Sequence, residues 1–151
     1  AAAFRTWPTS RIRGGVRGSR ADIGPVSEPV LENASGLCGG GVAVLWQYDG
    51  QALRFAAGKN VSQEGEAYSR EHPLELGTYN PTPRAGLERR TLHVLDVFAE
   101  PGYRPLVPPG IATYRPKAST VLAVPLLREN DLLGVITIWR FEKRLFTEKH
   151  V

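Results

Sequence analysis

The chain has 151 residues, of which 42% are hydrophobic and 23% charged, the size and balance of one globular domain with an ordinary core. Its apolar runs are only as long as strands and its one cysteine is Cys38, so the sequence excludes a transmembrane helix, an internal disulfide and the usual zinc spacings. The net charge of +4 comes from five arginines within residues 1–20, because the rest carries 14 of the 19 basic side chains and all 15 acidic ones, a net charge of −1.

Residues 1–20 are predicted to form a flexible arginine- and glycine-rich tail or linker, followed by one domain over residues 21–151. The tail has few apolar anchors, so the backbone ordering cost of roughly 1–2 kcal/mol per residue is not offset. An organelle transit peptide and a phosphate-binding arm are the alternatives for this segment. Because the basic charge belongs to the tail, nucleic acid is not an expected partner of the domain.

The first predicted element of the domain is a short amphipathic helix that ends before the three glycines at 39–41. Ser27 is the expected N-cap, which leaves Pro29 in the first turn, where its missing N–H costs nothing. Apolar residues recur along this helix at helical spacing: Ile23, Val26, Val30, Leu31, Ala34 and Leu37.

A period of two predicts strands over 42–48 and 52–57. They flank Asp49-Gly50, a pair whose residue types favour the left-handed dihedral angles of a hairpin turn. Ser62 then begins a predicted short helix over 62–70. This helix stops before Pro73, because the residue that precedes a proline disfavours the helical conformation.

After Pro73, a helix over 84–89 and a strand over 91–95 are predicted. Residues 96–117 contain five prolines and three aromatic residues, which predicts a long irregular loop of the kind that often carries function.

A second hairpin is predicted from strands over 120–127 and 132–141. Pro125 cannot donate a ladder hydrogen bond, so we expect a bulge or an outward-facing N–H position there. With hairpins at both ends and no alternation of strands and helices, the element order predicts an antiparallel sheet with helices packed on it, the α+β class.

Three separated segments carry a family resemblance, and in chain order they read LCGGGVAVLWQYDGQALRFAA, GLERRTLHVLDVFAEPGYRP and TVLAVPLLRENDLLGVITIWRFEKRLFTEK. They resemble a GAF domain of the kind found in bacterial sensor histidine kinases and nucleotide cyclases, from about residue 23 to residue 151. The resemblance implies a GAF-like, PAS-related fold. Such a fold has a six-stranded antiparallel sheet, with a pocket under loops and short helices on one face and terminal helices on the other.

The resemblance also implies a non-catalytic sensory or regulatory domain of a cytoplasmic bacterial signalling protein. A domain of this kind binds a small molecule and forms a homodimer through its terminal helices. It relays the signal to a covalently linked output domain, here a histidine kinase or a nucleotide cyclase. The alternative is a structural dimerisation module whose pocket is vestigial.

The C-terminal helix of such a domain is expected to be truncated here. Phe146 and Thr147 have the pattern of the residue before an N-cap and of the N-cap itself, and only four residues follow them. Because this helix would pair with the first one, we expect the apolar stripe of the first helix to be partly exposed.

The candidate ligand-binding residues are His93, Tyr103, Tyr114 and Arg115. The two tyrosines and Arg115 lie in the long loop over the sheet, where a largely apolar pocket with a few polar groups would form. His93 lies in a strand, where it is either a ligand contact or a satisfied sheet histidine. No nucleophile can be paired with a base, so no catalytic residue is predicted. No metal site is predicted either, and the sequence names no cofactor.

Three activities found among domains of this family are not expected. Cyclic-nucleotide-binding members carry a Phe followed shortly by Asp-Glu, and the end of this chain reads LFTEKHV instead. Cys38 does not match the cysteine that attaches a tetrapyrrole in phytochrome-type members, which lies in the second half of the domain. Methionine sulfoxide reductases of the superfamily use several cysteines, and one cannot supply that chemistry.

Overall fold

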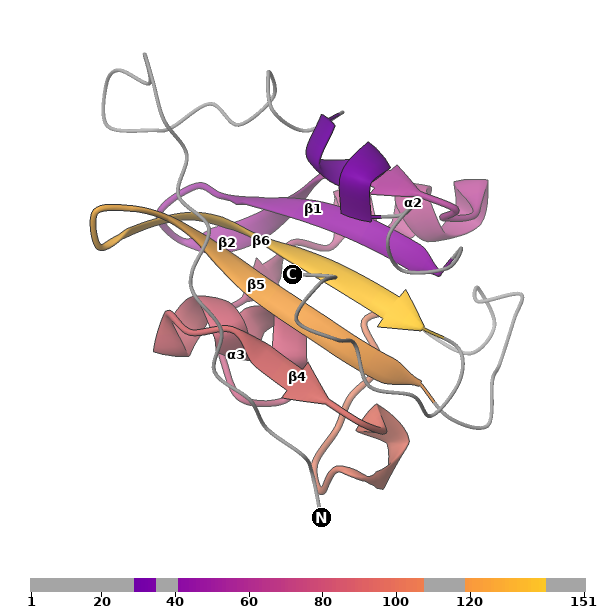
Figure 1. Ribbon diagram of the computed structural model, residues 1–151. Coiled ribbons are helices and arrows are strands. Elements are labelled where there is room, and N and C mark those ends of the chain that lie inside the picture. The colour runs from indigo at the N-terminus through magenta and orange to yellow at the C-terminus, as the bar shows by residue number, and fades with distance from the viewer. Residues whose placement is uncertain (1–28, 35–40, 108–118, 141–151) are drawn as a thin grey trace.

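Both predicted hairpins are present in the computed structural model, which describes residues 29–34, 41–107 and 119–140 (Figure 1). The first pairs β1 (Val42–Tyr48) with β2 (Ala52–Lys59), and the second pairs β5 (Thr120–Arg128) with β6 (Asp131–Arg140). Because β1 also pairs antiparallel with β6, the two hairpins form one continuous sheet.

Two short strands complete a six-stranded sheet with the order β3-β2-β1-β6-β5-β4. At one edge β3 (Leu74–Glu75), which was not predicted, pairs with β2, and at the other edge β4 (Leu92–Val94) pairs with β5. All of these pairings are antiparallel. The expected α+β class with an antiparallel sheet is therefore confirmed.

The expected irregularity at Pro125 falls close to it. Pro125 pairs with Val135 of β6, and a register shift follows between Leu126 and Leu127. The pairing with β4 ends opposite Ala123, so the missing N–H of Pro125 leaves no bond to β4 unmade.

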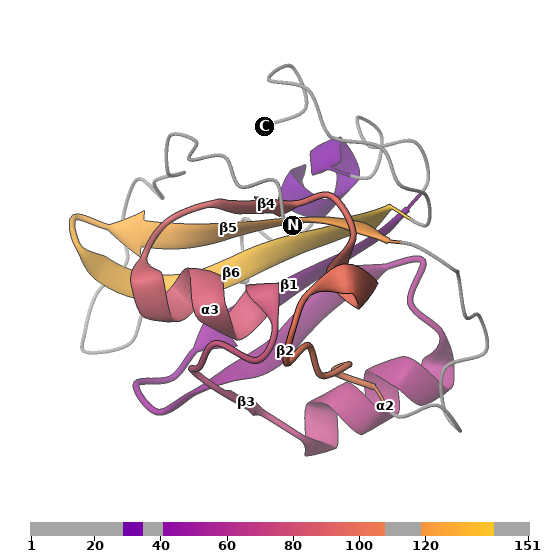
Figure 2. The same cartoon turned by 90° about the horizontal axis from the view of Figure 1, so that it is seen from below.

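Different helices cover the two faces of the sheet (Figure 2). The helix formed by residues 29–34, indigo in Figure 1, lies on one face. The other face carries three short helices: α2 (Gln63–Glu71), α3 (Pro81–Glu88) and the 3-10 helix η1 (Val97–Ala99).

The first helix is buried more completely than predicted. Leu31 and Ala34 are only 5% and 9% exposed, and they share an apolar cluster with Ile136 and Ile138 of β6. The expectation that the apolar stripe would be partly exposed is therefore wrong for these two residues, because the sheet itself covers them. Val30, at the edge of the cluster, is partly buried.

Helix α3 begins three residues earlier than predicted, at Pro81. The side chain of Asn80 caps it, and Pro81 and Pro83 occupy the first turn, where the missing N–H of a proline costs no intrahelical bond. Helix α2 begins as predicted, because Ser62 Oγ accepts the N–H of Gly65 at 3.0 Å.

Several predictions concern segments outside the described residues. They are the tail at 1–20, the Ser27 N-cap, the end of the first helix and the truncated C-terminal helix. The long loop is described as far as residue 107 and contains η1. Among the helices of the described ranges, none has the length and apolar character needed to cross a membrane.

Candidate functional site

A small cavity lies on the α3 face of the sheet, between the start of α3, strand β4 and the segment that follows η1. Its volume is about 40 Å³. Leu92 and Val94 of β4 supply apolar lining, while Arg84, Glu100 and Tyr103 bring polar groups from α3 and from the following segment. A concave site with an apolar base and a few polar groups is typical of small-molecule binding.

Residues 100–104, which we call the strap, close one side of this cavity. The backbone N–H of Arg104 donates to the Tyr79 carbonyl at 2.9 Å, and Asn80 Nδ2 donates to the Arg104 carbonyl at the same distance. The Arg104 guanidinium also lies over the Tyr79 ring, 4.3 Å from its centroid. The strap is therefore attached directly to the start of α3.

Tyr79 contributes to the wall through its ring and is fixed at its hydroxyl. The hydroxyl donates to the Glu75 carbonyl of β3 at 2.8 Å. Burial raises the pKa of Tyr79, although the Arg104 charge acts in the opposite direction. The hydroxyl is thus protonated at neutral pH and remains a donor.

The N-terminus of α3 lines the cavity but has no backbone N–H to offer a ligand in its first turn. Pro81 and Pro83 have no N–H, and the N–H groups of Thr82 and Arg84 are both bonded to Asn80, each at 3.1 Å. Phosphate groups bound at helix N-termini are held by such N–H groups. This helix end therefore lacks the usual means of holding a phosphate.

The segment before the strap is anchored to Ser119, just before β5, and the Glu100 N–H joins the strap to this segment by donating to the Val97 carbonyl at 3.1 Å. Asp96 Oδ1 accepts the N–H of Phe98 at 3.1 Å and that of Ser119 at 3.3 Å. Val97 donates its N–H to the Ser119 carbonyl at 3.0 Å, and Ser119 Oγ donates to the carbonyl of Arg140, at the end of β6, at 3.1 Å. These bonds connect the cavity wall to the last described residue of the sheet.

Positive charge is concentrated on the α3 side of the cavity. Glu88 accepts from Arg84 Nε at 2.6 Å and from Arg90 at 2.7 Å, so two guanidinium groups share one carboxylate. Burial, the largest single influence, raises the pKa of Glu88, but the hydrogen bonds from Arg84 and Arg90 together outweigh it and the net shift is downward. With Glu88 ionised, this group of three carries a net charge of +1.

The carboxylate of Glu100 lies on the strap side. Its Oε1 is buried and has no hydrogen-bond partner in the part of the chain that the structure describes. The ion pairs between described residues do not include one from Glu100 to Arg84. Arg84, the basic residue of the lining, is instead paired with Glu88.

Of the four predicted ligand-binding residues, the structure places one in the cavity and one away from it. Tyr103 lines the cavity. His93 is fully buried between two cavity-lining residues of β4, and strand alternation turns it toward the opposite face, where it pairs in register with Leu122. Tyr114 and Arg115 lie outside the described residues.

Sequence reasoning missed Arg84, Glu100 and the structural role of Asn80. Asn80 followed by proline was a readable N-cap signal, but nothing local indicates that the strap returns to it. In the described ranges, no group of three or more His, Cys, Asp or Glu residues is arranged to hold a metal ion.

The sequence matches the family model of the GAF domain over residues 22–151. Among solved structures, the GAF domain of a phosphoenolpyruvate-protein phosphotransferase from Coxiella burnetii is similar, with a TM-score of 0.68 and 16% identity over 87% of this chain and 75% of that chain. The GAF-B domain of DevS from Mycobacterium smegmatis has a TM-score of 0.60 and 19% identity, over 85% of this chain and 82% of that chain.

An enzyme has the same fold. The type II free methionine-R-sulfoxide reductase from Thermoplasma acidophilum has a TM-score of 0.64 and 14% identity, over 84% of this chain and 80% of that chain. At such identities the similarity to these structures concerns the fold alone. None of the curated proteins compared with the sequence matches it.

Proposed function

The chain belongs to the GAF domain family, and we propose that it is a non-catalytic sensory module that binds a small molecule in the cavity between α3, β4 and the strap. GAF domains are commonly regulatory domains that sense small molecules. The observation that carries the proposal is the cavity itself, which has an apolar base, a few polar groups and a wall formed by the strap.

The size of the cavity favours a small ligand. A cavity needs about 10–15 Å³ to hold one water molecule, so about 40 Å³ has room for only a few water-sized groups. A nucleotide would require the strap to move away, and the first turn of α3 would give its phosphate no backbone N–H. These two features argue against a cyclic nucleotide as the ligand.

The contacts of the strap suggest how binding is relayed. Tyr103 and Glu100 belong to the strap, so a ligand that contacts either residue contacts the strap directly. The bonds through Asp96 and Ser119 continue from there to Arg140, at the end of β6. We propose that the signal leaves the domain along this route toward a covalently linked output domain, a histidine kinase or a nucleotide cyclase, in a homodimer. Such coupling requires a ligand that binds two states with different affinities.

Thermal unfolding of the 151-residue chain with a panel of small metabolites tests the proposal. A ligand present at 100 times its Kd adds about 2.7 kcal/mol to the free energy of unfolding, which raises the Tm by several degrees. We expect at least one compound to give such a shift. Tyr103→Ala, which removes part of the wall, should reduce that shift by more than half.

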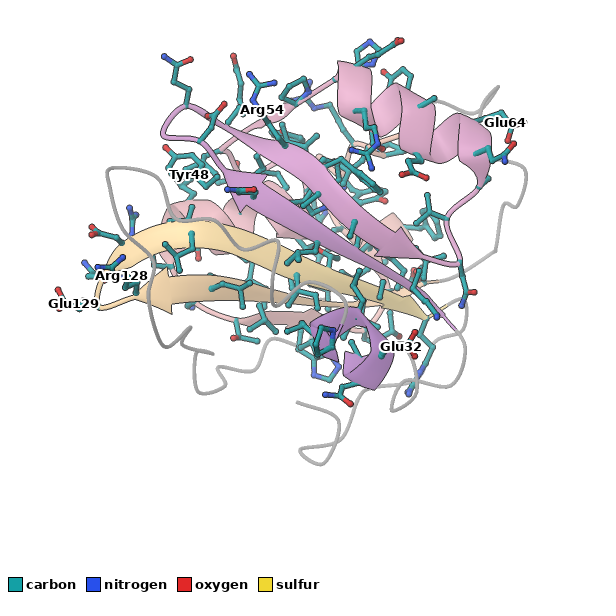
Figure 3. All side chains as sticks on the ribbon, turned by 90° about the horizontal axis from the view of Figure 1, so that it is seen from above. Glu32, Tyr48, Arg54, Glu64, Arg128 and Glu129 are labelled. Carbon is teal, nitrogen blue, oxygen red and sulfur yellow. The ribbon has the colours of Figure 1, made fainter. Side chains whose placement is uncertain are left out.

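Tyr48→Ala is the matched control, because it makes the same truncation beside the β1–β2 turn, as Figure 3 shows. It should keep the full ligand-induced shift. If no compound raises the Tm, or if both variants respond alike, the cavity is not a sensing site. The structural dimerisation module would then be favoured, provided that the chain is a dimer by sedimentation.

A further inference from the structure

We infer that the strap is a lid on the cavity, held shut by Asn80, and that its opening admits the ligand. The role of the ligand rests on the proposed function, whereas the lid is a property of the chain alone. The basis of the inference is that the strap is a stiff turn, fixed at both flanks, whose polar attachment to α3 involves one strap residue, Arg104.

The strap is stiff because it is a β-turn. The N–H of Tyr103 donates to the Glu100 carbonyl at 3.3 Å, which closes the turn over residues 100–103. Pro101 occupies its second position, and Gly102, with a φ of 74°, occupies its third. Proline followed by a residue of positive φ is the pattern of a type II turn. Since the proline ring also fixes φ, the turn can move as one body.

Both flanks of the strap are held by the domain. On one side Val97 is fully buried, and its carbonyl accepts the N–H of Glu100 at 3.1 Å. On the other side Leu106 packs against the apolar cluster that contains Ala85 of α3. The chain can therefore bend beside Glu100 and Pro105 while the flanks stay in place.

Asn80 connects the strap to α3. Its Oδ1 accepts the N–H of Thr82 at 3.1 Å and caps the helix, while its Nδ2 donates to the Arg104 carbonyl at 2.9 Å. The N–H of Arg104 donates to the Tyr79 carbonyl, also at 2.9 Å. These two bonds and the contact of the Arg104 guanidinium with the Tyr79 ring hold the strap against the start of α3.

Little else favours the closed position. Tyr103 packs on a cluster of three buried valines, but Pro101, Gly102 and Arg104 are exposed. Oε1 of Glu100 is buried and has no hydrogen-bond partner among the described residues, and a buried carboxylate oxygen without a donor is costly. Movement of the strap would return this oxygen to water. A segment with few buried apolar contacts opens at a low free-energy cost.

The closed cavity, of about 40 Å³, has room for only a few water-sized groups, so a larger ligand enters when the strap moves away. A ligand that contacts both Tyr103 and the α3 side then favours the closed state. Binding thus shifts an equilibrium that already exists in the free protein.

Amide hydrogen exchange of the free 151-residue chain tests the lid directly. The N–H of Arg104 is bonded only while the strap is shut, whereas that of Val97, bonded to the Ser119 carbonyl at 3.0 Å, belongs to the fixed flank. We expect the protection factor, the slowing of exchange relative to an unstructured amide, to be at least about tenfold lower at Arg104 than at Val97. Equal protection would mean that the strap does not open separately, and would overturn the inference.

Asn80→Asp is the key variant, because aspartate is an equally good N-cap but lacks the Nδ2 donor. It should lower the protection of Arg104 by about fivefold or more and that of Val97 by less than about twofold. Asn60→Asp is the matched control, since Asn60 Nδ2 donates to the Gly41 carbonyl at 3.1 Å. It should leave Arg104 unchanged, and a parallel loss of protection at Arg104 and Val97 in Asn80→Asp would contradict the inference.

Two further variants act on the strap itself. Arg104→Ala keeps both backbone bonds and loses the contact with the Tyr79 ring, so it should lower the protection factor of residue 104 by about twofold or more. Glu100→Gln removes the buried charge and should raise the protection of Arg104 by about threefold or more. Glu129→Gln, at the tip of the β5–β6 hairpin in Figure 3, should change nothing. A fall in protection in Glu100→Gln would overturn the role given to Glu100.

The compound with the largest thermal shift separates the lid from the proposed function. At 100 times its Kd it should raise the protection of Arg104 by at least about tenfold. If it raises the Tm but leaves Arg104 unchanged, sensing stands and the lid does not control binding. If no compound binds while the free chain and its variants behave as expected, the lid stands and the proposed function is wrong.

Discussion

Asp49 holds the first hairpin turn through both of its carboxylate oxygens. Oδ1 accepts the N–H groups of Gln51 and Ala52 at 2.8 and 2.9 Å, and Oδ2 accepts Arg54 Nε at 2.5 Å. The Ala52 N–H, followed by the Arg54 and Gln51 bonds, holds the pKa of Asp49 well below its usual range. The ionised carboxylate is therefore the form that stabilises the turn.

This shift predicts a pH dependence. The contribution of Asp49 is fully present above its unfolded pKa of about 3.9 and is lost as the pH falls through the lower folded value. Asp49→Asn should therefore lower the Tm at pH 7, and the gap to the wild type should narrow below about pH 4. Asp131→Asn, at the start of β6, is the control. A gap that stays constant from pH 7 to pH 2 contradicts this explanation.

Beneath α3, two buried hydroxyls bond to each other. Thr82 Oγ1 and Thr137 Oγ1 are 2.6 Å apart and both residues are fully buried, so this bond ties α3 to β6. Replacing either threonine with valine leaves the other hydroxyl without a partner and should cost about 1–3 kcal/mol. The double variant should cost at least about 1 kcal/mol less than the sum of the two single changes. Strictly additive values in denaturant unfolding would refute this coupling.

At the scale of the elements, the contact between β1 and β6 depends on a glycine. A Cβ on Gly134 would collide with the carbonyl oxygen of Trp46, whereas one on Gly50 would meet open space but a positive φ of 96°. Gly134→Ala should thus cost about 3 kcal/mol through overpacking, and Gly50→Ala about 1–2 kcal/mol through backbone strain. Chemical denaturation measures the free energy of unfolding of both variants. Equal costs would mean that a small backbone shift relieves the collision at Gly134.

The elements that were predicted well are those with strong local signals. Period-two patterns and Asp49-Gly50 specify the hairpins, and Ser62 specifies the start of α2. The helix predicted over 84–89 starts too late because it leaves out Pro81 and Pro83, although a first turn accepts proline. The two-residue strand β3 is too short to carry a pattern.

The site was less predictable because it is assembled by non-local bonds. Tyr103 was found because an aromatic residue in a long loop indicates a packing or binding role. Arg84 and Glu100 belong to segments that meet only through the bonds from the strap to Tyr79 and Asn80. No local pattern in the sequence encodes those bonds.

In the whole molecule, the sheet lies between the proposed ligand-binding cavity and the helix at 29–34. The cavity, α3 and the strap lie on one face, and the helix at 29–34 packs on the other (Figure 2). Strands β5 and β6 contribute to both faces, and Asp96, which precedes η1 and the strap, is bonded to Ser119, just before β5. A change at the cavity can thus reach the opposite face through strands that both faces share.

The most direct test of the central claim is a titration followed by amide chemical shifts, with the compound that gives the largest thermal shift. We predict that the first and largest changes fall on residues 78–84, 92–94 and 100–104, with smaller ones at 119–120. Changes centred on residues 29–34, or an absence of changes around the cavity, would contradict the claim that this cavity binds the ligand.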